Sequence, residues 1–101
     1  MTTRLIESLA ADTPPADLTR AQQALWWLRK GELRTGPEWD RAHEICAAGE
    51  GDRALDRIHA LAHWIECDMG NSDYWYRRAG SRRVGADVGA ERTRIAEDVS
   101  A

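Results

Sequence analysis

A chain of 101 residues suits a single domain built around one hydrophobic core. Its formal net charge of −3 argues against a nucleic-acid-binding protein, and 43% apolar residues suffice for a core without disulfides. The two cysteines, Cys46 and Cys67, lack the spacing of a disulfide framework, which favours free thiols in a reducing cytosol. Residues 1–11 show no signal peptide and no apolar run long enough for a membrane span, so a cytoplasmic protein is expected.

Taken in order, the chain divides into short helical segments separated by glycine and proline. Apolar residues recur at spacings of three and four within each segment, and no segment alternates with period two. The sequence therefore predicts no strand. The predicted helices cover residues 18–30, 38–48, 52–67, 72–79 and 90–98, with a further short helix near Leu5, Ile6 and Leu9.

This pattern predicts an all-α fold of four to six helices, stacked as antiparallel hairpins in one domain over residues 1–101. Trp39 precedes Ala42 as Met69 precedes Ser72, an internal echo at 30 residues that makes the arrangement loosely tetratricopeptide-like. The apolar residues thin out at both ends of the chain. A weakly ordered start over about residues 1–16 and a weakly ordered tail over about 81–101 are expected.

The segment over residues 52–66 is unusual because two stripes of different character run along one helix. An apolar stripe comprises Leu55, Ile58, Ala62 and Ile65. Beside it, at spacings of four, three, four and three, lie Asp52, Asp56, His59, His63 and Glu66. A margin made only of histidines and carboxylates beside a buried face is a candidate functional site.

The third histidine, His43, is expected to join this margin. If residues 38–48 and 52–67 are antiparallel neighbours about a turn near residue 51, His43 lies level with His59, one turn from His63. Three histidines with Glu66 nearby could hold a divalent metal at an open site. Acid–base chemistry by His43, His59, His63 and Glu66 is a second interpretation. Partly buried histidines that only hydrogen-bond to carboxylates or tyrosine hydroxyls are the third.

An aromatic and basic block follows at once over residues 74–78. In a helix these residues cannot all face one way, so Trp75 and Ala79 are expected inward, and Tyr74, Arg77 and Arg78 on another face. The arginines either clamp the acidic stripe or bind a small anionic ligand or a protein partner. The predicted ligand-binding residues are Asn71, Tyr74, Tyr76, Arg77 and Arg78.

Three motifs carry a resemblance to a known group of proteins. They are WDRAHEI over residues 39–45, IHALAH over 58–63 and NSDYWYRRAG over 71–80. With them, the chain resembles an uncharacterised family of small bacterial helical proteins over roughly residues 20–82. The sequence departs from the pattern with Trp64 in place of Arg, Cys67 in place of Gly and Ser72 in place of Ala. The resemblance implies no established activity.

The leading functional hypothesis is a small cytoplasmic helical binding or adaptor protein. Its site would be the histidine–carboxylate margin beside the Tyr/Arg block. A small enzyme that uses the same histidines, with a divalent metal as its cofactor, is the alternative. Trp26 and Trp27 cannot both be buried by one helix face, which raises a homodimer as a further interpretation. The basic run near Arg82 is outweighed by the acidic remainder, so nucleic acid is disfavoured as a partner.

Overall fold

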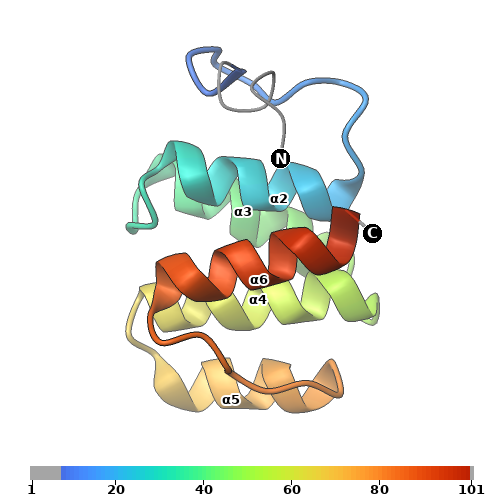
Figure 1. Cartoon of the computed structure of the whole chain (residues 1–101), viewed down its shortest axis with the longest axis vertical. Coiled ribbons are helices and arrows are strands. Elements are labelled where there is room, and N and C mark those ends of the chain that lie inside the picture. The colour runs from blue at the N-terminus through green and yellow to red at the C-terminus, as the bar shows by residue number, and fades with distance from the viewer. Residues whose placement is uncertain (1–7, 101) are drawn as a thin grey trace.

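The structure is a computed structural model that describes residues 8–100 of the chain. Within that range every regular element is a helix and no strand occurs, which confirms the predicted all-α fold. Most of the short helix predicted near Leu5 lies outside the described residues. The helices are α2 (Arg20–Lys30), α3 (Pro37–Ala48), α4 (Arg53–Ile65), α5 (Met69–Arg78) and α6 (Val88–Ser100) (Figure 1).

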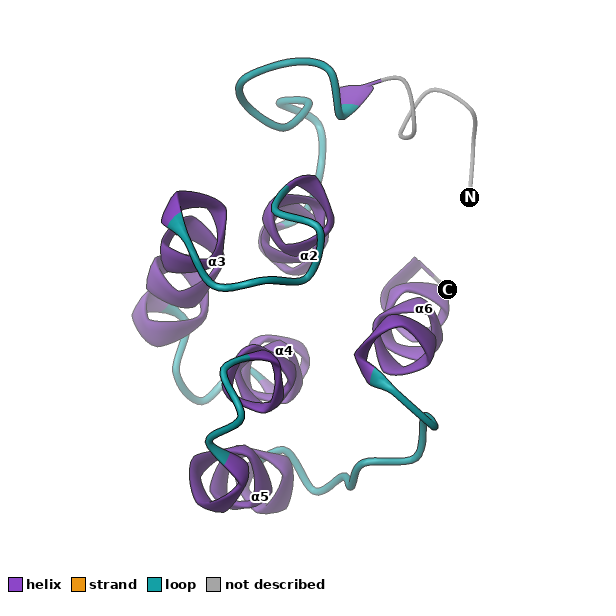
Figure 2. Ribbon diagram, turned by 90° about the vertical axis from the view of Figure 1, so that its left-hand side faces the viewer, coloured by secondary structure: helices purple, strands orange, loops and turns teal. Residues whose placement is uncertain are grey.

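The helices lie with their axes roughly parallel, and α4 is at their centre (Figure 2). Helix α4 contacts each of the other four described helices, whereas α5 packs mainly on α4. Short turns reverse the chain between α2 and α3, between α3 and α4, and between α4 and α5, so these neighbours are antiparallel (Figure 1). None of the helices among residues 8–100 combines the length and apolar character needed to cross a bilayer.

Local sequence accounts for where the helices begin. Thr19 and Gln22 form a capping box at the start of α2, and Pro37 occupies the first turn of α3, where a missing N–H costs nothing. Asp52 accepts hydrogen bonds from two backbone N–H groups of α4, and Asp68 caps α5. Asp52 is therefore a cap, a sufficient structural role for one carboxylate of the predicted stripe.

The core is formed where α2, α3, α4 and α6 meet. Helix α4 contributes most because residues on almost all of its circumference are covered by neighbours. Leu61 is fully buried although it lies outside the predicted apolar stripe, since α4 is covered on several sides. The core cluster consists of Ala24, Leu25, Leu28, Ala42, Cys46, Leu55, Ile58, Leu61 and Ile95.

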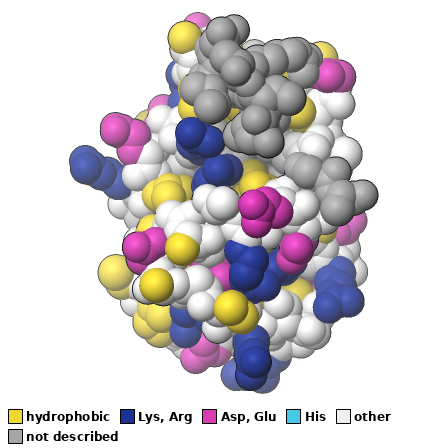
Figure 3. Space-filling view, viewed as in Figure 1, with side chains coloured by type: hydrophobic (Ala, Val, Ile, Leu, Met, Phe, Trp, Pro, Cys, Tyr) yellow, Lys and Arg dark blue, Asp and Glu magenta, His cyan; other side chains and the backbone are white. Residues whose placement is uncertain are grey.

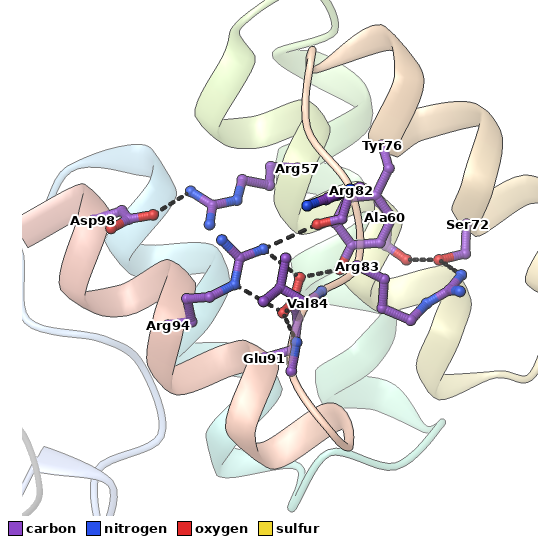
Figure 4. A network of polar contacts seen from close by, with 11 residues as sticks. Arg57, Ala60, Ser72, Tyr76, Arg82, Arg83, Val84, Glu91, Arg94 and Asp98 are labelled. Carbon is purple, nitrogen blue, oxygen red and sulfur yellow. Dashed lines mark hydrogen bonds and ion pairs between the residues drawn. The ribbon is translucent and has the colours of Figure 1, made fainter.

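The C-terminal region differs from the prediction. Helix α6 is longer than the expected 90–98 segment, and it packs against α2 and α4 with Ile95 fully buried. Glu91 is also fully buried and connects α6 to α5 and to the loop between them. It accepts hydrogen bonds from Tyr76 Oη of α5 at 2.7 Å and from the Gly85 N–H of the loop at 2.7 Å (Figure 4). Arg94 donates to the same carboxylate through Nε at 3.0 Å and Nη2 at 2.9 Å.

Candidate metal centre

Three imidazoles from two helices meet on one side of α4. His43 lies on α3, and His59 and His63 lie one turn apart on α4. The Nε2 atoms of His43 and His59 are 3.1 Å apart. The rings of His59 and His63 stack with centroids 4.9 Å apart, and the His43 and His63 centroids are 5.4 Å apart. The predicted register of His43 with His59 is confirmed.

Two tryptophans form the walls of this cluster. Trp39 stacks on His43 at 5.0 Å between centroids, and its Nε1 donates to the Ala62 carbonyl at 2.8 Å, which fixes the indole against α4. Trp75 of α5 stacks on His59 at 3.9 Å. Neither tryptophan was predicted as a site residue, although Trp39 precedes His43 by four residues on the same helix. That spacing was an available signal for Trp39; the contact of Trp75 depends on how α5 docks.

Glu66 holds the third imidazole in one orientation. Its Oε2 lies 2.6 Å from Nδ1 of His63, and because an ionised carboxylate only accepts, the Nδ1 atom carries the proton. Nε2 of neutral His63 then keeps its lone pair. A carboxylate that accepts from the far nitrogen of a histidine is the usual support for a metal ligand. The predicted contact between Glu66 and one imidazole of the margin is present.

Burial favours the neutral forms of His43 and His59. His59 and His63 are buried, with 4% and 8% of their surfaces exposed, and His43 is partly buried. The pKa of His59 is lowered to about 4 by burial first and then by His43 and His63. The pKa of His43 is also lowered, by burial and by His63, against smaller opposing effects from nearby carboxylates. No histidine is visible among the described residues on the face in Figure 3.

The ligand atoms are close enough for one ion. One ring nitrogen from each histidine lies within 4.8 Å of the others. Two metal–nitrogen bonds of 2.0–2.1 Å at a tetrahedral angle place the nitrogens about 3.3 Å apart, close to the 3.1 Å between His43 and His59. The ring nitrogen of His63 lies within 4.8 Å of the other two, so it must approach them by up to about 1.5 Å to reach the same spacing. A second candidate group, His63, Glu66 and Asp68, shares His63 but is largely exposed.

His43 and His59 can also hydrogen-bond to each other without metal. One Nε2–H must donate to the other Nε2, and Nδ1 of His59 is buried with no hydrogen-bond partner among the described residues. An unpaired lone pair is tolerated better than an unpaired buried N–H, so His59 is assigned as the donor to His43. Metal binding at His59 Nε2 then requires its proton to move to Nδ1.

The predicted Tyr/Arg block does not converge on one site. Asn71 bonds to Asp68 at the start of α5, Tyr76 donates to Glu91, and Tyr74 accepts from Arg78 at 3.1 Å. No tyrosine hydroxyl therefore reaches the histidines, and the closure expected from Tyr74 or Tyr76 was wrong. As predicted, Trp75 and Ala79 are buried and Tyr74, Arg77 and Arg78 are exposed.

The proposed arginine clamp on the acidic stripe was also wrong. Arg78 lies over the rings of Tyr74 and Trp75 and approaches Glu50, before α4, at 3.7 Å. The stripe carboxylate Asp56 instead accepts from the Gly51 N–H. Arg77 contacts no carboxylate in the described part of the chain.

Both members of the Trp26–Trp27 pair are accommodated within the chain. Trp26 is buried and donates to Ser8 Oγ at 2.9 Å, and Trp27 packs against the core cluster. The pair consequently gives no ground for a homodimer.

Comparison with known proteins suggests no function for this chain. No family model, no curated protein and no solved structure matches the chain. The resemblance to the small bacterial helical family stays a prediction. Cys67 adopts a φ of 63°, a left-handed conformation that favours glycine.

Proposed function

We propose that this protein is a small helical metal-binding protein whose ligands are His43, His59 and His63. The observation that carries the proposal is the meeting of three ring nitrogens from two helices, all within 4.8 Å of one another. The lowered pKa values of His43 and His59 favour neutral imidazoles near pH 7, the form that binds metal. Glu66 supports the same role by fixing His63.

An all-imidazole donor set favours a borderline transition metal. Zn²⁺, Co²⁺, Ni²⁺ and Cu²⁺ accept imidazole nitrogen readily, whereas Mg²⁺ and Ca²⁺ prefer oxygen ligands. Three protein ligands leave a fourth position of a tetrahedral ion for water or another donor, as in catalytic zinc sites. His43 is the most exposed of the three, so the ion and its fourth ligand would enter on that side.

Metal binding is preferred over acid–base catalysis for a specific reason. A general acid or base works best with a pKa near the operating pH, and the pKa of His59 is about 4. Burial between Trp75 and α4 also separates His59 from solvent. The cytoplasmic assignment belongs to the same proposal, and the free thiols of buried Cys46 and exposed Cys67 support a reducing compartment.

Titration of metal-free protein with Zn²⁺ and Co²⁺ tests the proposal. We expect one ion per chain by calorimetry, and a cobalt absorption spectrum of tetrahedral type. His43→Asn should weaken binding by at least about 100-fold, because loss of a mere supporting group already costs 10–100-fold. Glu66→Gln should weaken it by about 10–100-fold through His63.

Glu44→Gln provides the matched control. Glu44 is exposed and adjacent to His43, so this change alters local charge without removing a ligand atom. It should leave the affinity within a few-fold of the original. Absence of stoichiometric binding, or equal binding by His43→Asn, would reduce the cluster to a set of packed, hydrogen-bonded imidazoles.

A further inference from the structure

A second polar site lies at the C-terminal end of α5, away from the histidine cluster. A pocket of about 250 Å³ opens between the last turns of α5 and the extended segment that follows it. Three arginines and a serine give it a basic character in a chain whose net charge is −3. Its lining residues are Asp73, Tyr76, Arg77, Ser81, Arg82 and Arg83.

The wall of this pocket is fixed by contacts already within the fold. Arg83 points back to α5 and donates through Nη2 to Ser72 Oγ at 3.1 Å (Figure 4). The same Nη2 donates to Asp73 Oδ1 at 2.8 Å. Its guanidinium also lies over the rings of Trp64, at 5.0 Å, and Tyr76, at 5.7 Å. Because Asp73 offsets only one of three positive charges, the pocket keeps a net positive lining.

Several hydrogen-bond donors of the pocket residues have no acceptor within the described part of the chain. Within the described part of the chain, the guanidinium groups of Arg77 and Arg82 have no hydrogen-bond or ion-pair partner. The backbone N–H groups of Arg82 and Arg83 have no acceptor among the same residues. Arg83 Nε is buried and likewise unpaired. Adjacent free amides beside guanidinium groups are a common way of binding an oxyanion.

We infer that this pocket binds the phosphate group of a small phosphorylated molecule. A phosphate offers several strong acceptor oxygens, which suit planar guanidinium donors better than a single carboxylate would. The volume of 250 Å³ lies below the usual range of about 300–1,000 Å³ for drug-sized ligands, so a small ligand is indicated. The pocket retains Arg77 from the sequence-based prediction but replaces Arg78 with Arg82 and Arg83.

Nuclear magnetic resonance with inorganic phosphate and ribose 5-phosphate tests the inference at constant ionic strength. Both probes should give saturable shifts of the Ser81, Arg82 and Arg83 amide signals, with the histidine signals unchanged. Arg77→Ala and Arg82→Ala should each lower the affinity by about 10-fold, the scale of one hydrogen bond to a charged group. Both side chains are exposed, so these changes should leave the fold intact.

Arg41→Ala is the control, since Arg41 is an exposed arginine of α3 remote in sequence from the pocket. It should bind both probes as the unaltered protein does. Tighter binding of ribose 5-phosphate would identify an esterified ligand, and equal binding would identify free phosphate; either supports the inference. Shifts that do not saturate, or an equal loss in Arg41→Ala, would overturn it. The result is independent of metal binding.

Discussion

At the scale of single residues, the central fact is that three ionisable rings share one buried volume. Protonating His59 would place a positive charge beside His43 and His63 and away from water. The carboxylates that affect the cluster, Glu66, Asp40 and Glu44, act on His43 without reversing its lowered pKa. The folded protein therefore keeps His43 and His59 neutral at pH values where the unfolded chain binds protons.

This difference predicts acid sensitivity in the metal-free protein. The pKa of His59 is about 4 when folded, against 6.5 when unfolded, so the stability it contributes is complete above about pH 6.5. It should be lost as the pH falls from about 6.5 to about 4, at about 1.4 kcal/mol for each unit by which the pKa is lowered. Urea unfolding across this range, with a chelator present, measures the loss.

His59→Gln supplies the comparison, because glutamine does not titrate. This variant should show a flatter dependence of unfolding free energy on pH, whatever its stability at pH 7. A histidine titration by magnetic resonance should show His59 neutral down to about pH 5, one unit above its pKa of about 4. A normal midpoint near 6.5 would contradict the argument from burial.

Residue-level prediction succeeded where helical geometry alone determines contact. The spacing of His59, His63 and Glu66, and the short turn before α4, suffice to bring them to His43. It failed for the hydroxyl groups, because the partner of Tyr76 is Glu91 on α6, fifteen residues away. A buried glutamate that accepts five hydrogen bonds produces no periodic pattern in the sequence, so its partners could not be predicted.

At the scale of elements, the α3–α4 hairpin places His43 of α3 opposite His59 of α4. Gly49 ends α3, and a Cβ atom at this position would overlap the Leu55 side chain of α4. The absence of a side chain therefore lets α4 return close against α3. The length of α6 was underestimated from the sequence because two of its polar residues, Asp98 and Glu91, help to hold it in place. Asp98 pairs with Arg57 of α4 at 2.7 Å, and Glu91 is fully buried (Figure 4).

Gly49→Ala should consequently loosen the hairpin. The added methyl must shift the Cδ1 end of the Leu55 side chain within the core, and overpacking of this kind costs about 1–3 kcal/mol. Urea unfolding measures the cost, and the His43–His59 contact should weaken with it. Gly70→Ala in α5 is the matched control, since nothing lies within 4 Å of its added carbon. Alanine there should be neutral or stabilising by up to about 1 kcal/mol.

At the scale of the whole molecule, the candidate site joins α3 to α4 and is covered by α5. Unfolding would therefore disperse all three ligands, and a bound ion would stabilise the entire fold. The general fold followed from periodicity and glycine placement in the sequence. The way α5 and α6 dock did not, because both depend on polar contacts between distant segments.

Metal binding should be coupled to the stability of the whole domain. An ion that binds only the folded state adds about 2.7 kcal/mol at 100 times its dissociation constant. For a domain of this size, that shift corresponds to a rise in Tm of about 10–20 °C. Thermal unfolding with increasing Zn²⁺ at pH 7.5 should show this rise.

His43→Asn separates this effect from nonspecific stabilisation. The variant keeps an amide in the cluster but loses one ligand of the proposed site, so its Tm should respond little to Zn²⁺. Glu44→Gln should respond as the unaltered chain does, because its change lies outside the ligand set. A similar rise in His43→Asn would place the ion elsewhere, for example at the exposed His63, Glu66 and Asp68 group. Destabilisation by Zn²⁺ would mean that the unfolded chain binds the ion better, which would separate metal binding from this fold.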